Sequence, residues 1–185
     1  MCGRYWIDPE DDQLEQIIAQ MQRTDLPVKT SGEIFPGDAL PVLCMSRAGN
    51  ERAFAMTWGF ALPNGQKVIN ARSETAGEKP LFAQSMAQRR CLLPMSAYFE
   101  WQKDGREKIK YRIAPADPGL YFLAGLYRFE GDRPVCCVLT LPASPELSPI
   151  HPRMPLILPA QAQKSWLRQG AVDGANPLRM RAARA

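Results

Sequence analysis

The sequence predicts a strand-rich α+β fold. Its 17 prolines among 185 residues favour short strands and loops over long helices. Short apolar runs bounded by turn residues fill most of the chain, whereas helical periodicity is confined to a few segments. A chain of this length can bury an ordinary core, and no linker or repeat interrupts it. We therefore expect a single domain over 1–185, with its core at about 2–168 and a basic tail at about 171–185.

The first predicted element is an amphipathic helix over residues 9–22. Asp8 is expected to be its N-cap and Pro9 its first helical residue, because both residue types are favoured at those positions. Apolar residues follow at the i, i+3, i+4, i+7 spacing of one helix face: Leu14, Ile17, Ile18 and Met21. We expect this helix to pack against the core and to carry no functional residue.

Strands, turns and two shorter helices are predicted for the rest of the chain. Asp104-Gly105 lies between two alternating segments, which is a strong hairpin signal. The predicted elements are, in order, strands over 40–46 and 51–58, a turn at 63–65, a strand from 67 that leads into 70–75, a helix over 80–88, a strand entry at 89–93, hairpin strands over 97–103 and 107–113, strands over 120–128 and 135–140, a proline-rich loop over 142–155 and a helix over 160–168.

Composition limits the possible locations and partners. No stretch approaches the roughly 18 apolar residues of a membrane span, and the acidic segment after Trp6 does not resemble a signal peptide. We therefore expect a cytoplasmic protein without membrane contact. We also expect a monomer. The net charge of +4 permits a polyanionic partner without requiring one.

The cysteine pattern argues against disulfides and metal sites. The chain has five cysteines, an odd number, and no CxxC pair. One histidine and scattered cysteines give no zinc-ligand spacing. Four of the cysteines lie in apolar runs and are expected to be core residues: Cys44, Cys91, Cys136 and Cys137. The sequence thus predicts no metal ion and no other cofactor.

Cys2 is the first candidate for chemistry. Removal of Met1 before this small residue would leave a cysteine with a free thiol and a free α-amine, whose ordinary pKa values are about 8.5 and about 8. Such a group can attack an acyl carbon, with its own amine as base. It can also capture an aldehyde, first as a Schiff base and then as a thiazolidine ring. The alternative is that Cys2 is an inert second residue.

Three further side chains could act with it, and each has an ordinary structural alternative. His151 is the only imidazole and lies in a proline-stiffened loop, although a lone histidine can be a surface or capping residue. Glu100 shares a predicted strand face with Tyr98 and Gln102. Its aromatic neighbours suggest partial desolvation suited to proton transfer, against the alternative of a solvent-facing carboxylate. Asn70 follows an apolar strand, where it can orient a substrate or simply form a turn.

Two arginines are candidate anion contacts. Arg72 lies two residues after Asn70 and Arg4 two residues after Cys2, so either could bind a phosphate near these side chains. Each of these signals is weak alone.

Five motifs occur in order along the chain: Met1-Cys2-Gly3-Arg4-Tyr5, Trp58-Gly59-Phe60, Ile69-Asn70-Ala71-Arg72-Ser73-Glu74-Thr75, Tyr98-Phe99-Glu100-Trp101 and His151-Pro152-Arg153-Met154-Pro155. This set resembles the SOS response-associated peptidase (SRAP) family, the bacterial abasic-site processing proteins. The matches span residues 2 to about 168, and the combination is specific where no single motif is. The resemblance implies a largely antiparallel, barrel-like sheet with a few peripheral helices.

The resemblance also implies a function in the DNA damage (SOS) response. An abasic deoxyribose in single-stranded DNA opens to an aldehyde, which Cys2 would capture as a thiazolidine DNA–protein crosslink after self-removal of Met1. Asn70 would orient Cys2 and the opened sugar. Glu100 would assist proton transfer, and His151 would act as acid–base near the sugar. Further candidates contact DNA: Arg4 and Arg72 at the flanking phosphates, and Trp58, Phe60 and Trp101 as stacking surfaces that could equally be core.

The sequence departs from the family pattern in two internal places. Residues 31–37 contain Glu33 where many members have an Arg-Tyr-Asn stretch, and a glutamate beside a phosphate channel would repel DNA. Residues 62–65 lack the tryptophans that some members place before the asparagine strand. The chain is also expected to be a compact variant without a further C-terminal segment.

Three rival functions remain open at this point. Class II glutamine amidotransferases also begin Met-Cys-Gly, but here the only Asn-Gly pair, Asn64-Gly65, lies in a turn. The protein could instead only bind DNA or a partner, with Cys2 inert. It could also cleave other proteins, as an N-terminal-cysteine peptidase without a DNA function.

Overall fold

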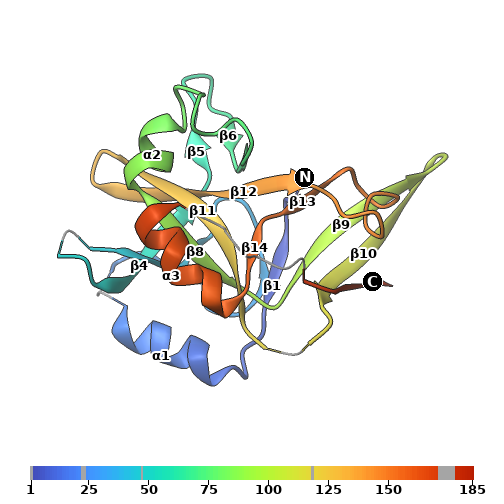
Figure 1. Ribbon diagram of the computed structural model, residues 1–185, viewed down its shortest axis with the longest axis horizontal. Coiled ribbons are helices and arrows are strands. Elements are labelled where there is room, and N and C mark those ends of the chain that lie inside the picture. The colour runs from blue at the N-terminus through green and yellow to red at the C-terminus, as the bar shows by residue number, and fades with distance from the viewer. Residues whose placement is uncertain (1, 22–23, 47, 118, 171–177) are drawn as a thin grey trace.

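The computed structural model describes residues 2–21, 24–46, 48–117, 119–170 and 178–185 (Figure 1). Its centre is a barrel of five strands in which β12 pairs with both β4 and β11 and thereby closes the sheet in the order β12-β4-β3-β8-β11. The barrel strands are β3 (Ala39–Met45), β4 (Glu51–Trp58), β8 (Arg90–Met95), β11 (Tyr121–Glu130) and β12 (Arg133–Pro142). Four of the five pairings are antiparallel, and β4–β12 is parallel. The predicted strand-rich, barrel-like α+β fold is confirmed.

Short strands extend the barrel at β12 and β11. Strand β7 (Asn70–Arg72) runs parallel to β12, and β13 (Arg153–Pro155) pairs with the end of β12. Strand β14 (Ile157–Leu158) pairs with β11. The segments that carry Asn70 and Arg153 are therefore both attached to β12.

A second sheet lies beside the barrel, and its strands are in the order β15-β10-β9-β1-β2. All its pairings are antiparallel. The strands are β1 (Tyr5–Ile7), β2 (Gly32–Ile34), β9 (Ala97–Asp104), β10 (Glu107–Pro115) and β15 (Met180–Arg184). Figure 1 shows the β9–β10 hairpin projecting from the body of the molecule. The hairpin predicted around Asp104-Gly105 is thus confirmed, with strands slightly longer than expected.

Three helices and a small hairpin complete the described structure. The helices are α1 (Asp12–Gln20), α2 (Ala83–Gln88) and α3 (Ala160–Gln169), and the hairpin joins β5 (Phe60–Ala61) to β6 (Lys67–Val68) around the predicted turn. None of the described helices has the length and apolar character needed to cross a membrane.

The start of the first helix differs from the prediction. Asp11, not Asp8, is the N-cap, because Asp11 Oδ1 accepts hydrogen bonds from the backbone N–H groups of Gln13 (2.9 Å) and Leu14 (3.2 Å). Asp8 accepts from the Glu10 N–H instead and closes a turn before the helix. Two possible caps lie three residues apart here, and the later one is used.

The predicted basic tail is also corrected. Its last residues form β15, which pairs with β10 from Tyr111↔Arg184 to Pro115↔Met180 and so belongs to the second sheet. Residues 171–177, the first part of the predicted tail, lie outside the described residues, as does Met1.

The core fills the barrel and the space beneath the helices. Cys44, Cys91, Cys136 and Cys137 are all buried, as predicted, and none of the described cysteines forms a disulfide. Burial raises the pKa of the Cys44 thiol to about 11 and of the Cys137 thiol to about 12, so these thiols are protonated near neutral pH.

Candidate active site

Asn70 and Cys2 are joined by a direct hydrogen bond. The Asn70 side-chain amide Nδ2 donates to the backbone carbonyl of Cys2 over 2.9 Å. Asn70 begins β7, which is held against β12 by the parallel pairing Val138↔Asn70. Asn70 Oδ1 is buried and accepts no hydrogen bond within the described part of the chain. The asparagine therefore fixes the Cys2 backbone and keeps an acceptor available beside it.

The Cys2 thiol is buried and protonated. The residue is 0% exposed, and Sγ lies 3.9 Å from the Arg4 carbonyl oxygen. Burial, followed by the negative charge of Glu100, raises the pKa of this thiol to about 12. Sulfur at this position therefore needs a base to take its proton when it reacts.

Glu100 lies close enough to Cys2 for its charge to raise the pKa of the thiol. It shares one face of β9 with Tyr98 and Gln102, and we call this side the inner face. It is 4% exposed, which excludes the solvent-facing alternative. Tyr98, on the same face of β9, is also buried. Its hydroxyl pKa is raised by burial and then by the nearby Cys2 and Glu100 groups. Sequence reasoning put these two side chains on one face but gave Tyr98 no role, because its proximity to Cys2 depends on the pairing Tyr5↔Tyr98 between β1 and β9.

His151 lies in the loop between β12 and β13. Its Nδ1 is 3.0 Å from both the backbone nitrogen and the carbonyl oxygen of Arg153, which fixes the ring relative to the loop. The loop is attached to the inner face of β9, because Gln102 Nε2 donates to the Pro149 carbonyl over 3.0 Å. Gln102 in turn accepts from the Tyr111 hydroxyl at 3.1 Å. The histidine loop is thus fixed to the strand that carries Glu100.

An ion pair connects the histidine loop with the asparagine segment. The Arg153 guanidinium binds both carboxylate oxygens of Glu74, with Nη2 2.9 Å from Oε2, and also donates to the Thr140 carbonyl. These hydrogen bonds lower the pKa of Glu74 to about 2. Both residues lie in motifs that carry the resemblance. Their contact could not be inferred from the sequence because 79 residues separate them.

Trp58 and Phe60 do not have the predicted role as stacking surfaces. Both are 0% exposed. Trp58 packs edge-on against Tyr5, with ring centroids 5.3 Å apart, and its Nε1 donates to the Ile69 carbonyl over 3.0 Å. Phe60 packs against Phe82. The apolar rings gain more from burial than from solvent exposure. Trp58 instead holds the residue that precedes Asn70.

Arg4 lies in a cluster of cations and aromatic rings. Its guanidinium is 4.5 Å from the Phe35 ring centroid and 5.1 Å from that of Trp101. Glu33 Oε1 lies 3.6 Å from Arg4 Nη1 and 2.9 Å from Lys110 Nζ. Glu33 therefore neutralises two cations, where the sequence suggested a carboxylate that repels DNA. Arg72 is exposed, on the same strand as Asn70.

No group of three or more His, Cys, Asp or Glu side chains is placed to hold a metal ion among the residues that the structure describes. The candidate site comprises Cys2, Asn70 and Glu100, with the His151 loop held against β9.

Comparison with known proteins gives the chain a family. A family model described as SOS response associated peptidase (SRAP) matches residues 1–183. The chain belongs to the SRAP family. Among relatives of this SRAP protein, the abasic site processing protein YoqW of Bacillus subtilis is 32% identical over 187 residues, which are 94% of this chain and 83% of that protein. The abasic site processing protein YedK of Escherichia coli is 30% identical over 179 residues, covering 91% and 80%.

Solved structures share the fold of this SRAP protein. A protein from Bordetella bronchiseptica superposes with a TM-score of 0.79 at 21% identity and covers 100% of this chain and 99% of its own. A protein from Bacteroides thetaiotaomicron gives a TM-score of 0.76 at 20% identity, with coverage of 99% and 91%.

Proposed function

We propose that this SRAP protein captures the ring-opened abasic deoxyribose of single-stranded DNA as a thiazolidine on Cys2, acting as a monomer after removal of its own Met1. The observation that carries the proposal is the convergence on Cys2. Asn70 donates a hydrogen bond to the Cys2 carbonyl, and the charge of Glu100 raises the pKa of the Cys2 thiol. The three residues come from distant segments of the chain. The proposal is also supported by relatives named abasic site processing proteins.

The capture proceeds in two bond-forming steps. The α-amine of processed Cys2 adds to the C1′ aldehyde, and loss of water gives a Schiff base. Sγ then adds to the same carbon while the nitrogen gains a proton, which closes the five-membered ring without any oxidation or reduction. Because the thiol is protonated near neutral pH, its proton must be removed as the C–S bond forms. Glu100 is the base for this transfer and the source of the proton for nitrogen.

The other predicted site residues position the substrate or exchange protons with it. Asn70 Nδ2 holds the Cys2 carbonyl, and Asn70 Oδ1 accepts from a hydroxyl of the opened sugar. His151 exchanges protons with the sugar from its anchored loop. Arg4 and Arg72 bind the flanking phosphates. No cofactor takes part in these steps.

The test is a denaturing gel with Met1-processed protein and a single-stranded oligonucleotide that contains one abasic site. We expect a shifted band with wild type and none with Cys2→Ala or with a chemically blocked α-amine. Cys44→Ala, which removes another buried cysteine, should crosslink normally. Glu100→Gln should slow crosslinking by tens-fold or more, as is typical when a general acid–base is lost. A wild-type protein that leaves the oligonucleotide unshifted refutes the proposal.

Removal of Met1 is tested separately, by mass spectrometry of the purified chain. Wild type should have lost the mass of one methionine. The variant Cys2→Ala is produced in a host whose methionine aminopeptidase does not process its N-terminus. If Cys2 is the nucleophile for the cleavage, this variant should retain Met1. Loss of Met1 from Cys2→Ala under those conditions contradicts self-processing.

A further inference from the structure

The β9–β10 hairpin separates its charges by face. The strand register pairs Lys103 with Lys108 and Asp104 with Glu107, so both cross-strand pairs near the tip have like charges. Like charges directly opposite each other destabilise a hairpin. If Glu107 and Lys108 exchanged places, each lysine would instead lie opposite a carboxylate. The arrangement instead gives one basic face and one acidic face.

The same separation continues toward the body of the molecule. Residues paired in an antiparallel register lie on the same face, and Trp101↔Lys110 and Phe99↔Arg112 extend the basic side. The opposite side carries Glu100 and Gln102. We call the first side the basic face, and it consists of Phe99, Trp101, Lys103, Lys108, Lys110 and Arg112.

The two faces have different surroundings. The inner face is attached to the histidine loop through Gln102 and Pro149. On the basic face, Lys103, Lys108 and Arg112 are exposed, and Figure 1 shows the hairpin extending away from the barrel. The basic face is therefore accessible to a macromolecule.

Aromatic rings lie between the cations of this face. Lys110 Nζ is 4.1 Å from the Phe99 ring centroid and 5.9 Å from that of Trp101. Trp101 is half-buried, so part of its ring is open to solvent. Cations along a backbone path with interleaved aromatic rings are typical of surfaces that bind single-stranded nucleic acid without sequence preference.

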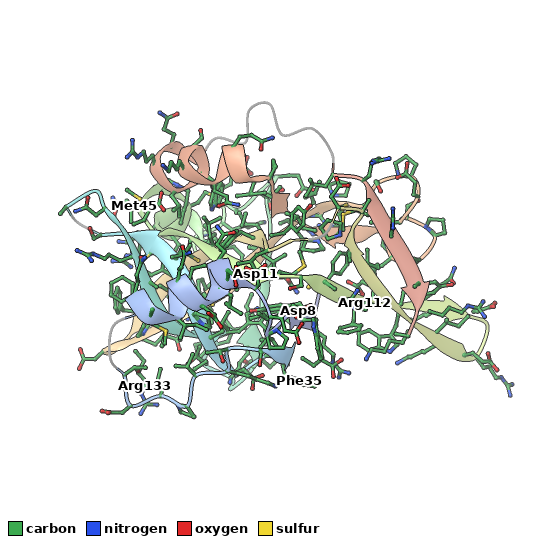
Figure 2. All side chains as sticks on the ribbon, turned by 90° about the horizontal axis from the view of Figure 1, so that it is seen from below. Asp8, Asp11, Phe35, Met45, Arg112 and Arg133 are labelled. Atoms are coloured by element: carbon green, nitrogen blue, oxygen red, sulfur yellow. The ribbon has the colours of Figure 1, made fainter. Side chains whose placement is uncertain are left out.

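The basic face has a defined beginning and end. It begins at Arg4, which lies two residues after Cys2 in the sequence. The Phe99 N–H donates to the Arg4 carbonyl, and the Arg4 guanidinium lies over the Trp101 ring. It ends at a hollow of ≈ 560 Å³ that Arg112 lines together with Asp8 and Asp11. Figure 2 shows these three residues on the side of the molecule that carries α1. A polyanion therefore has a path from Arg4 toward the hairpin tip that leads away from Asp8 and Asp11. At the start of this path it has to displace Glu33 from Arg4 and Lys110.

We propose that the basic face is a second binding surface for single-stranded DNA, which holds the strand that continues beyond the lesion. The inference rests on the proposed function in taking DNA as the polyanion. It goes beyond that function by assigning the hairpin a role in affinity that is separate from the covalent chemistry at Cys2.

The experiment compares two double variants at the hairpin tip. Lys103→Gln/Lys108→Gln removes two cations from the basic face, and Asp104→Asn/Glu107→Gln removes two carboxylates from the opposite face of the same strands. Binding to an unmodified thymidine oligonucleotide of about 20 nucleotides, a length that spans several stacking sites, is measured by fluorescence anisotropy over a salt series. Thermal melting first confirms that both variants fold like wild type.

We expect Lys103→Gln/Lys108→Gln to weaken binding several-fold at low salt. It should also reduce the slope of log K against log salt by about 1.4, since each phosphate bound on a single strand contributes about 0.7. The control Asp104→Asn/Glu107→Gln should leave the slope unchanged. An unaltered slope in the lysine variant, or an equal change in both variants, overturns the proposal. If Lys103→Gln/Lys108→Gln weakens binding of a duplex of the same length more than binding of the single strand, the assignment to single-stranded DNA is wrong.

A second measurement separates this inference from the proposed function. Crosslinking to an abasic oligonucleotide too short to reach the hairpin tip should proceed at wild-type rate in Lys103→Gln/Lys108→Gln. If wild type does not crosslink, the proposed function fails, whereas the result with unmodified DNA still decides the role of the hairpin. If wild type crosslinks and the lysine variant binds long oligonucleotides normally, the hairpin inference alone fails.

Discussion

Single side chains set the charge of the candidate site. Glu33 lies between Arg4 and Lys110 and neutralises both, and the Lys110 hydrogen bond is the main reason why the pKa of Glu33 is lowered. A phosphate that binds these cations has to displace this carboxylate. Under the proposed function, Glu33 therefore competes with the DNA backbone for these two cations.

Glu33→Gln should strengthen binding of single-stranded DNA several-fold at low salt. The two cations become available to phosphate, so the salt slope should steepen by about 0.7 for each additional phosphate that the protein binds. Anisotropy titrations at several salt concentrations measure both quantities. Glu51→Gln, which removes an exposed carboxylate from the start of β4, is the control for net charge. If both variants bind equally tightly, Glu33 has no specific role.

Glu74 makes a pH-dependent contribution at the same scale. Arg153 lowers the folded-state pKa of Glu74 to about 2 from an ordinary value of 4.5. A lowered carboxyl pKa contributes stability that is fully present above the ordinary value and is lost as pH falls toward the folded value. Because the Glu74 side chain is 44% exposed, solvent screening makes the effect modest.

We therefore expect Glu74→Gln to lower the melting temperature by a constant amount between about pH 6 and 8. The difference from wild type should shrink as pH falls from about 4.5 toward 2. Thermal denaturation followed by circular dichroism across this range provides the measurement. A difference that does not depend on pH means that the glutamate acts through packing alone.

At the scale of elements, the turn Trp58-Gly59-Phe60 connects the barrel with the candidate site. Gly59 has φ +123°, a conformation that L side chains rarely adopt, and its N–H donates to the Cys136 carbonyl over 2.7 Å. A Cβ at this position would lie 3.2 Å from Lys67 Cβ and 3.4 Å from Ile69 Cγ2. The side chains of Lys67 and Ile69, just before Asn70, thus pack directly against the glycine.

Gly59→Ala should destabilise the protein by about 1–3 kcal/mol, because it adds backbone strain and crowds the segment before Asn70. It should also slow crosslinking, since Asn70 holds the Cys2 carbonyl. Urea unfolding and the gel assay measure the two effects. Gly77→Ala, at a glycine whose added Cβ meets nothing within 4 Å, is the matched control. Equal stability of the two variants would show that the turn tolerates a side chain.

The elements were largely predictable from the sequence, and the errors have local causes. Period-two patterns and Asp104-Gly105 identified the hairpin, because both signals depend on neighbouring residues. The helix began later than expected because Asp8 and Asp11 are both suitable caps and only Asp11 is used. Trp58 and Phe60 were proposed as stacking surfaces because a sequence does not show which side of a strand is covered.

At the scale of the whole molecule, the barrel brings the site together. Strand β12 closes the barrel by pairing with β4 and β11. The same strand also pairs with the Asn70 strand and with the segment after His151. The motif order in the sequence selected the candidate residues that the structure brings together. It could not predict the parallel pairing of β7 with β12 or the contact between Glu74 and Arg153, since both depend on segments far apart in the chain.

The closed barrel also makes a prediction about its buried thiols. Cys91 and Cys136 lie at 0% exposure in one core cluster, on two barrel strands, whereas Cys137 faces the other side of β12 and packs in the cluster that includes Trp166 of α3. Cys44, 3% exposed, lines a hollow of ≈ 840 Å³. A closed sheet has no free edge from which strands can peel, so the thiols of Cys91 and Cys136 should become accessible only when the barrel opens as a unit. We expect them to react with a maleimide at one common rate. Cys44 should react faster, because a local movement at the hollow suffices to expose it. Mass spectrometry of peptides after timed labelling measures each site, and mild urea should accelerate labelling of Cys91 and Cys136 in parallel. Separate rates for Cys91 and Cys136 would show that the barrel opens strand by strand.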